Sequence, residues 1–313
     1  MAISSTGRTA SARAAQDDKV GNVLIIFHII YIRVVSRLKS RMVSIVHTTD
    51  PVAGPKKALD MIGADRILSR YQRILIKPNY VNGSHPSTGV TTDPKVVRGI
   101  VEYLLEHGWG CDRFAVGEGG MASVNTMDSF RSSGLIDELK GYGVKIIDLN
   151  QEPHVEVGIE GGRSLKSVRV ARSFVEYDCI LSVPKLKVHC WSLSTLSMKN
   201  MMGGMLPKGI MHDDLAQKIV DLNRAFGPEL TVIDGILGCQ RHELACDPID
   251  SEVIVAGEDF VATDAIGSFL MGLCPEDVPY LALARKAGLG ECEMEKIEYA
   301  GEQISRLRKL YKM

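Results

Sequence analysis

The order of apolar segments along the chain constrains its fold more than any other feature. From Met42 onward, runs of strand length alternate with segments whose apolar residues recur at helical spacing. Several strand-like runs are apolar throughout, which is typical of a parallel sheet covered by helices on both faces. We therefore predict an α/β fold built on a largely parallel sheet flanked by helices. Strands are expected at 43–48, 73–81, 112–120, 144–150, 178–184, 229–236, 251–257 and 296–301, and helices at 54–63, 93–108, 123–143, 213–226, 260–271 and 277–287.

Two segments depart from this alternation. Residues 151–173 have the pattern of a small β-hairpin inserted into the layered fold. Residues 1–41 are interpreted as a leader, either disordered or a start-site artefact, because "MVSIVHTTD" from Met42 opens like a first strand. The apolar run at 23–35 contains His28 and Arg33 and is shorter than the roughly 20 residues of a membrane span. We predict a single α/β domain over residues 42–313.

Composition narrows the classes of partner. The net charge is −1 and aromatic residues make up 6% of the chain, which argues against nucleic acid as a ligand. The seven cysteines form no C-x-x-C pair, so the chain has no iron–sulfur motif and no zinc ribbon. Their odd number and apolar surroundings indicate mostly buried thiols in a reducing, cytoplasmic compartment. We expect no membrane partner.

Polar residues cluster after the predicted strands, where ligands bind in open α/β sheets. "PKLKVH" places Lys185, Lys187 and His189 at alternate positions, so in an extended chain they point to one side. A helix expected to begin near Ser192 would bring Lys199 back towards them. Like charges so close repel unless an anion or a carboxylate lies between them. A solvated loop, or basic residues at a helix end, are the simpler alternatives, but the four residues together favour an anion site.

Other strand ends add candidates for the same site. Lys77 and Asn79 follow one strand, Glu118 another and Asp234 a third. We expect Asn79, Glu118, Lys185 and Asp234 to lie in one cleft, because each follows a strand of the same sheet.

Five segments, "ILIKPNYV", "YDCILSVPKLKVH", "MKNMMGG", "TVIDGI" and "GEDFVATDAIGSFLMG", occur in an order that resembles domain of unknown function family 362. The resemblance covers about residues 42–301 and implies an α/β fold and a site, while the family's reaction is not established. It also implies an association with ferredoxin-type iron–sulfur proteins. Its signature falls on Lys77, Pro78, Asn79, Lys185, Lys187, His189, Lys199, Asn200, Gly203, Asp234, Gly235, Asp259 and Asp264.

The chain departs from that family in two places. It lacks the cysteine-rich iron–sulfur module, so an electron-transfer role would need a ferredoxin-type partner. Where relatives have a glycine- and proline-rich loop, it reads "ILGCQRHELACDP" at 236–248. The spacing of Cys239, His242 and Cys246 is unlike that of a zinc site, and we interpret this segment as a loop with buried thiols. A more distant similarity to nickel-pincer lactate racemases points towards racemase or lyase chemistry.

Two classes of function remain open. In the first, the chain is an enzyme acting on a small anionic substrate, a carboxylate or a phosphate. His189 is then the general acid or base and Lys199 a second catalytic residue. Lys77, Asn79, Glu118, Lys185, Lys187 and Asn200 bind the substrate, and Glu118, Asp234 and Asp264 are candidate ligands of a transition-metal cofactor. In the second class, the chain is a non-catalytic accessory protein of an iron–sulfur, electron-transfer or cofactor-assembly system.

Overall fold

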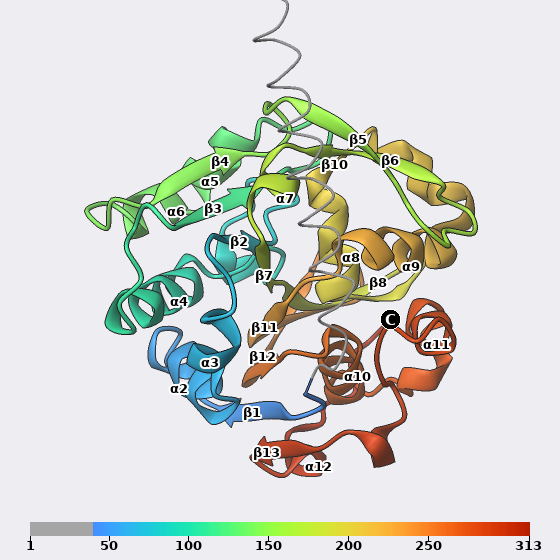
Figure 1. Ribbon diagram of the computed structural model, residues 1–313. Coiled ribbons are helices and arrows are strands. Elements are labelled where there is room, and N and C mark those ends of the chain that lie inside the picture. Colours follow the sequence, from blue (N-terminus) through green and yellow to red (C-terminus); the bar gives the residue numbers. More distant parts are fainter. Residues whose placement is uncertain (1–39) are drawn as a thin grey trace, which may run out of the picture. The chain divides into compact units, whose positions relative to one another are not determined.

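A ten-stranded mixed sheet organises residues 40–313, the part of the chain that this computed structural model describes (Figure 1). The predicted leader, apart from its last two residues, lies outside the described residues. Strands of the main sheet are β1 (Val43–His47), β2 (Ile74–Pro78), β3 (Phe114–Glu118), β4 (Lys145–Asp148), β7 (Cys179–Val183), β8 (Lys185–His189), β9 (Leu193–Thr195), β11 (Leu230–Gln240), β12 (Asp247–Gly257) and β13 (Tyr299–Gly301). The order along the sheet is β13-β1-β12-β11-β7-β2-β3-β4, and β8 pairs with β11 and β9.

Most strand pairs in this sheet are parallel, as predicted. Five neighbouring strands form a parallel series in the order β11, β7, β2, β3 and β4. β8 also pairs in parallel with β11, and β13 with β1. The antiparallel members are β12, which follows β11 in a long hairpin, β1, which pairs with β12, and β9. The predicted α/β class is confirmed.

Helices cover both faces of the sheet (Figure 1). The main ones are α2 (Ala53–Met61), α3 (Ala64–Leu68), α4 (Pro94–Glu106), α5 (Thr126–Ser132), α6 (Leu135–Glu138), α7 (Ser173–Glu176), α8 (Ser197–Asn200), α9 (Leu215–Phe226), α10 (Phe260–Leu270), α11 (Pro279–Lys286) and α12 (Ile304–Leu307). Helices α2, α3 and α4 bury one apolar core against β2, β3, β7 and β11. Helix α10 packs on β11 and β12, and α9 and α11 pack on each other.

The predicted hairpin insertion is present. β5 (His154–Gly158) and β6 (Ser167–Ala171) pair in antiparallel fashion. The two-residue strand β10 (Met205–Leu206) adds to β6 and completes a small second sheet. This sheet connects the hairpin to the segment that follows α8, which is the segment that carries part of the site described below.

Two local predictions were wrong. The chain after His189 does not enter a helix near Ser192: it turns back as β9 and begins helix α8 only at Ser197. Polar Ser192 and Ser194, together with the cross-strand pairing of Val188 with Ser194, favour the strand. The segment 236–248 is a loop only at 241–246, because β11 runs to Gln240 and β12 begins at Asp247.

The cysteines also differ from expectation. Cys239 and Cys246 form a disulfide across the turn between β11 and β12, with Cα atoms 5.3 Å apart. Of the free cysteines, Cys179 and Cys292 are buried, whereas Cys190 and Cys274 are exposed. The prediction of mostly buried thiols was therefore wrong.

No helix within residues 40–313 has the length and apolar character needed to cross a bilayer.

Candidate functional site

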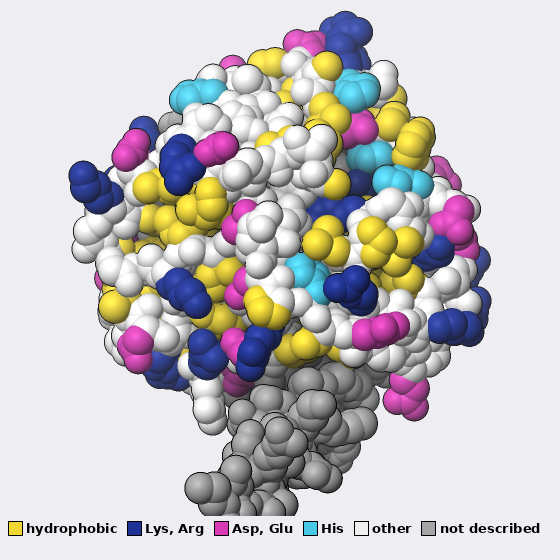
Figure 2. Space-filling view, turned by 90° about the horizontal axis from the view of Figure 1, so that it is seen from above, with side chains coloured by type: hydrophobic (Ala, Val, Ile, Leu, Met, Phe, Trp, Pro, Cys, Tyr) yellow, Lys and Arg dark blue, Asp and Glu magenta, His cyan; other side chains and the backbone are white. Residues whose placement is uncertain are grey.

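A cavity of about 510 Å³ lies beyond the carboxyl ends of β2 and β3. Its wall includes six of the predicted site residues: Asn79, Glu118, Lys187, His189, Lys199 and Asn200. The sequence reasoning did not place Trp191, Lys208, His212 and Glu243 there, although all four line the same cavity. Figure 2 shows histidine side chains gathered beside a recess in which basic side chains are visible.

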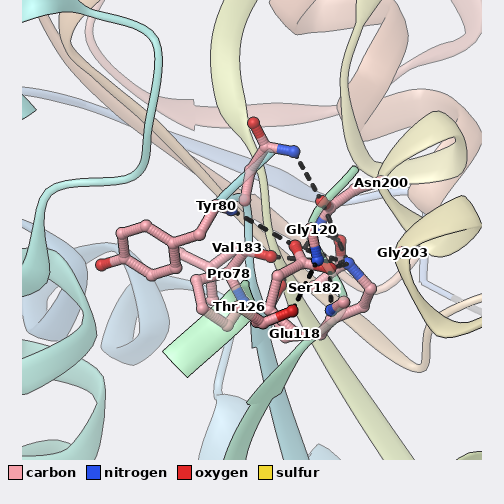
Figure 3. Close-up of polar contacts among 12 residues, drawn as sticks. Pro78, Tyr80, Glu118, Gly120, Thr126, Ser182, Val183, Asn200 and Gly203 are labelled. Carbon is pink, nitrogen blue, oxygen red and sulfur yellow. Dashed lines mark hydrogen bonds and ion pairs between the residues drawn. The ribbon is translucent and has the colours of Figure 1, made fainter. Parts of the chain in front are cut away.

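A buried network of polar side chains forms the floor of the site. Lys77 Nζ lies 2.8 and 2.9 Å from the two carboxylate oxygens of Glu118, and both side chains are almost fully buried. The same ammonium donates to Asn200 Oδ1 at 3.2 Å, and the Asn200 amide donates to Lys77 O and Ser182 Oγ. Figure 3 shows how Glu118 and Asn200 meet between the strand ends. Lys77 therefore neutralises Glu118 and holds Asn200, and it is not itself part of the cavity wall.

Asn79 connects this network to the cavity. Its Nδ2 donates to Asn200 Oδ1 at 3.1 Å, and its Oδ1 accepts from Lys187 Nζ at 2.9 Å. Lys187 also donates to Val90 O at 3.2 Å. An ammonium has three N–H groups, so two hydrogen bonds fix Lys187 and one remains for a ligand.

Gly203 is required for the floor to close. A Cβ at this position would collide with the Glu118 carboxylate and would lie 2.6 Å from Lys77 Nζ. Only glycine lets the backbone approach the ion pair this closely, which accounts for the first glycine after "MKNMM".

Lys185 does not share the cleft. Its Nζ lies 2.8 Å from Asp234 Oδ2, and both side chains are about 1% exposed or less. Asp234 also accepts the backbone N–H of Asp93. Lys185 lines a separate cavity of about 340 Å³ beside the start of α4. The expectation that Asn79, Glu118, Lys185 and Asp234 share one cleft therefore holds only for Asn79 and Glu118.

The reason lies in the pairing of β8 with β11. Asp234 lies opposite Lys185, but Cys239 lies opposite Lys187, so the register shifts by several residues between the two lysines. This irregularity breaks the simple alternation that predicted Lys185 on the same side as Lys187 and His189.

The three candidate metal ligands do not meet. Glu118 binds Lys77 and Asp234 binds Lys185, as described. Asp264 accepts the backbone N–H groups of Ser197 and Met198, at the start of α8. Burial raises the pKa of Asp264 to about 8, although these two hydrogen bonds favour the charged form. Each carboxylate thus has a partner from the protein and supports local structure.

Burial shapes the chemistry of the cavity lysines. It lowers the pKa of Lys199 to about 8. It lowers the pKa of Lys187 to about 7, assisted by the nearby positive charge of Lys199. It also lowers the pKa of Lys208 to about 8. Burial disfavours the charged form of an ammonium, and an anion beside it would favour that form, so an anionic ligand would raise the pKa of all three lysines.

His189 is held in one tautomer. Its Nδ1 accepts the backbone N–H groups of Trp191 at 3.1 Å and Ser192 at 3.4 Å. Burial and the charge of Lys199 lower the pKa of His189 to about 3, so the ring is neutral and its proton is on Nε2. That nitrogen lies 3.6 Å from Glu243 Oε1. His189 is therefore arranged to donate a hydrogen bond from Nε2 into the site.

His189, Cys190 and Glu243 lie close enough to suggest a metal site, with ligand atoms within 4.8 Å of one another. The hydrogen bonding points to a different role. Nε2 would have to lose its proton to bind a metal, while Nδ1 is already occupied by two backbone donors. Glu243 also accepts from Cys190 Sγ at 3.4 Å, and burial together with this hydrogen bond raises the pKa of that thiol. We assign no metal to this group.

Glu243 is the functional residue that sequence reasoning missed most clearly. It lies in the turn that the Cys239–Cys246 disulfide closes, and it brings a carboxylate to His189. The sequence did mark this segment as unusual, because residues 236–248, which include Glu243, stand where the resembling family has a glycine- and proline-rich loop. Lys208 and His212, from the 3₁₀ helix η3 (Lys208–Asp214), carried no comparable signal.

Comparisons with known proteins agree with the resemblance seen in the motifs. Residues 74–268 match the family described as "Domain of unknown function (DUF362)", and the chain belongs to this family. A curated relative, "Thylakoid-associated protein sll1697" of Synechocystis sp., is 25% identical over 239 residues, which are 71% of this chain and 70% of the relative.

Among solved structures, the lactate racemase apoprotein of Thermoanaerobacterium thermosaccharolyticum is similar to this chain at 11% identity and a TM-score of 0.46. The similarity covers 76% of this chain and 58% of that structure. A similarity of this degree carries no statement about activity.

Proposed function

We propose that this member of the DUF362 family is an enzyme that binds a small carboxylate or phosphate in the cavity beside Lys199. The observation that most supports this proposal is the positive charge of the cavity wall. Three lysines, Lys187, Lys199 and Lys208, face a space in which only two acidic side chains take part. Glu118 is already paired with Lys77, which leaves Glu243 against three cations. A small anion is the ligand that balances such a site.

The cavity also has a group suited to proton transfer. Lys199 has a pKa of about 8, close to the pH at which enzymes usually work. A group with a pKa near the working pH is an effective acid or base. We assign anion binding to Lys187 and Lys199 and acid–base chemistry to Lys199. His189, whose pKa of about 3 keeps the ring neutral, donates a hydrogen bond from Nε2 to the ligand rather than acting as the acid or base. The buried polar network positions Lys187 through its hydrogen bond to Asn79 and holds the strand ends together; its members are Asn79, Asn200, Lys77 and Glu118.

Oxalate and inorganic phosphate are suitable probes, and calorimetric titration measures their binding. We expect one of them to bind, and Lys199→Ala to weaken that binding more than about tenfold, since removing one partner of a buried charge pair costs about 2–5 kcal/mol. Lys145 is exposed on β4, away from the cavity, so Lys145→Ala is a control with the same change in charge. Equal affinity in all three proteins, or no binding of either anion, would contradict the proposal.

The accessory-protein alternative predicts anion or partner binding without turnover. The cytoplasmic location and the ferredoxin-type partner stay predictions from the sequence.

A further inference from the structure

Lys199 differs from the other lysines of this region in its hydrogen bonding. Each of the other four lysines donates to at least one carboxylate, amide or backbone oxygen: Lys77, Lys185, Lys187 and Lys208. Within residues 40–313, Lys199 Nζ makes no hydrogen bond and no ion pair, yet it lines the cavity. Its amine thus lines the cavity with no hydrogen-bond or ion-pair partner among the described residues.

A second polar group beside it also lacks a partner. Thr195 is 4% exposed and lines the same cavity. Its Oγ1 is buried without a hydrogen bond among the described residues. A buried hydroxyl with no partner is unfavourable unless a ligand supplies one.

The neighbours of Thr195 define what that ligand carries. Lys187 lies directly opposite Thr195 on β8 and β9, so their side chains are adjacent on one face. Lys187 has one N–H left after its bonds to Asn79 and Val90. Thr195, Lys187 and the Nε2–H of His189 can therefore donate hydrogen bonds to a carboxylate. The amine of Lys199 can attack an electrophilic carbon of the same ligand.

We propose that Lys199 is a nucleophile that forms an imine with a small 2-oxo carboxylate, whose carboxylate is held by Lys187 and Thr195. This inference rests on the proposed function, because it names the substrate class of the same site. The lowered pKa of Lys199 supports it, since a larger share of the side chain is then the neutral, nucleophilic amine.

The step balances without any further reactant. The lone pair of Lys199 Nζ adds to the carbonyl carbon, and the π electrons of the carbonyl move to its oxygen. Two protons from the amine then leave with that oxygen as water, and a C=N bond replaces the C=O bond. Glu243 and Cys190 oppose the lowering of the Lys199 pKa by burial, and Lys199 in turn lowers the pKa of Lys187 and of His189.

Reductive trapping tests the inference. The full chain is incubated with pyruvate and sodium cyanoborohydride, whose hydride adds to the imine carbon and gives a stable secondary amine. Peptide mass spectrometry then locates a mass gain equal to pyruvic acid less one oxygen atom. We expect modification of Lys199 at least about tenfold above that of exposed Lys145, because the neutral fraction of an amine rises tenfold for each unit by which its pKa falls.

Two controls separate this inference from the proposed function. Lys199→Arg keeps the positive charge but has no nucleophilic amine, so it should bind oxalate and give no adduct at position 199. Lys145→Arg should be trapped like the natural protein, and excess oxalate should suppress the adduct. Oxalate binding with uniform labelling of all lysines would overturn the imine and leave the anion site intact. No binding of oxalate and no selective adduct would overturn both.

Discussion

Replacing Lys199 with methionine should make the protein without ligand more stable. Methionine has a similar length and no charge, so the substitution removes the buried ammonium and keeps the packing. Burial lowers the pKa of Lys199 from 10.5 to about 8. One pKa unit corresponds to about 1.4 kcal/mol, so at pH values below 8 the charged side chain disfavours folding by on the order of 3 kcal/mol.

The increase in stability caused by Lys199→Met should become smaller as the pH rises. Between pH 8 and about 10.5 the unfolded chain binds a proton at Lys199 that the folded chain does not, so the stability of the natural protein rises with pH in this window. Lys199→Met lacks this increase in stability with pH. Its higher free energy of unfolding is therefore fully present below pH 8 and disappears as the pH approaches 10.5.

Urea unfolding at pH 7 and at pH 10, followed by circular dichroism, measures the difference. We expect Lys199→Met to raise the free energy of unfolding at pH 7 by about 2 kcal/mol, somewhat less than the full electrostatic term, because water in the cavity relieves part of it. At pH 10 the two proteins should differ by less than about 1 kcal/mol. A loss of stability at pH 7, or a gain of equal size at both pH values, would refute the reasoning.

Three further predictions concern the floor and the histidine. Gly203→Ala should lower the free energy of unfolding by about 3 kcal/mol through its collision with Glu118, whereas Gly209→Ala, where a Cβ meets nothing, should be neutral; chemical denaturation compares them. Lys77→Met should lower it by about 3–5 kcal/mol because Glu118 is left charged and unpaired, and adding Glu118→Gln should restore part of the loss in the same assay. His189→Gln should keep oxalate affinity in calorimetry, because its amide still donates, whereas His189→Leu, which cannot donate, should weaken it about tenfold; equal affinity in both variants would remove His189 from the site.

Much of the fold could be predicted because its signals are local. The Asp93–Pro94 start of α4 is one example: Asp93 accepts the N–H of Lys95, and proline occupies the first turn. The buried strands β2, β3 and β7 were predicted from apolar runs alone. The extension of β11 and β12 was not predicted, because residues such as Gly238, Gln240 and Asp247 do not follow the apolar alternation of a strand. They become strand residues through cross-strand pairing, in which Gly238 lies opposite Ile249 and Gln240 opposite Asp247.

The site was predicted in its residue types and only partly in its grouping. Strand-end placement correctly brought Asn79, Glu118, Lys187 and His189 to one cavity. Lys199 and Asn200 also line it, but they lie on α8, and the helix expected to begin near Ser192 was wrong. The same rule failed for Lys185, because a register shift between β8 and β11 depends on tertiary packing that no local pattern reveals. Nor could sequence distinguish Lys77, whose charge is satisfied by Glu118, from Lys199, whose amine is free, because pairing depends on residues 41 positions away.

Proton uptake on anion binding tests the central claim most directly. An anion in the cavity stabilises the charged forms of Lys187 and Lys199, whose pKa values are lowered to about 7 and about 8 without it, so binding should draw protons from the buffer. Calorimetric titration of oxalate at pH 8, repeated in buffers of different ionisation enthalpy, counts those protons. The account predicts net uptake at pH 8, tighter binding as the pH falls towards 7, and a smaller uptake in Lys199→Met. Binding without proton uptake and with no dependence on pH would place the anion elsewhere and contradict the account.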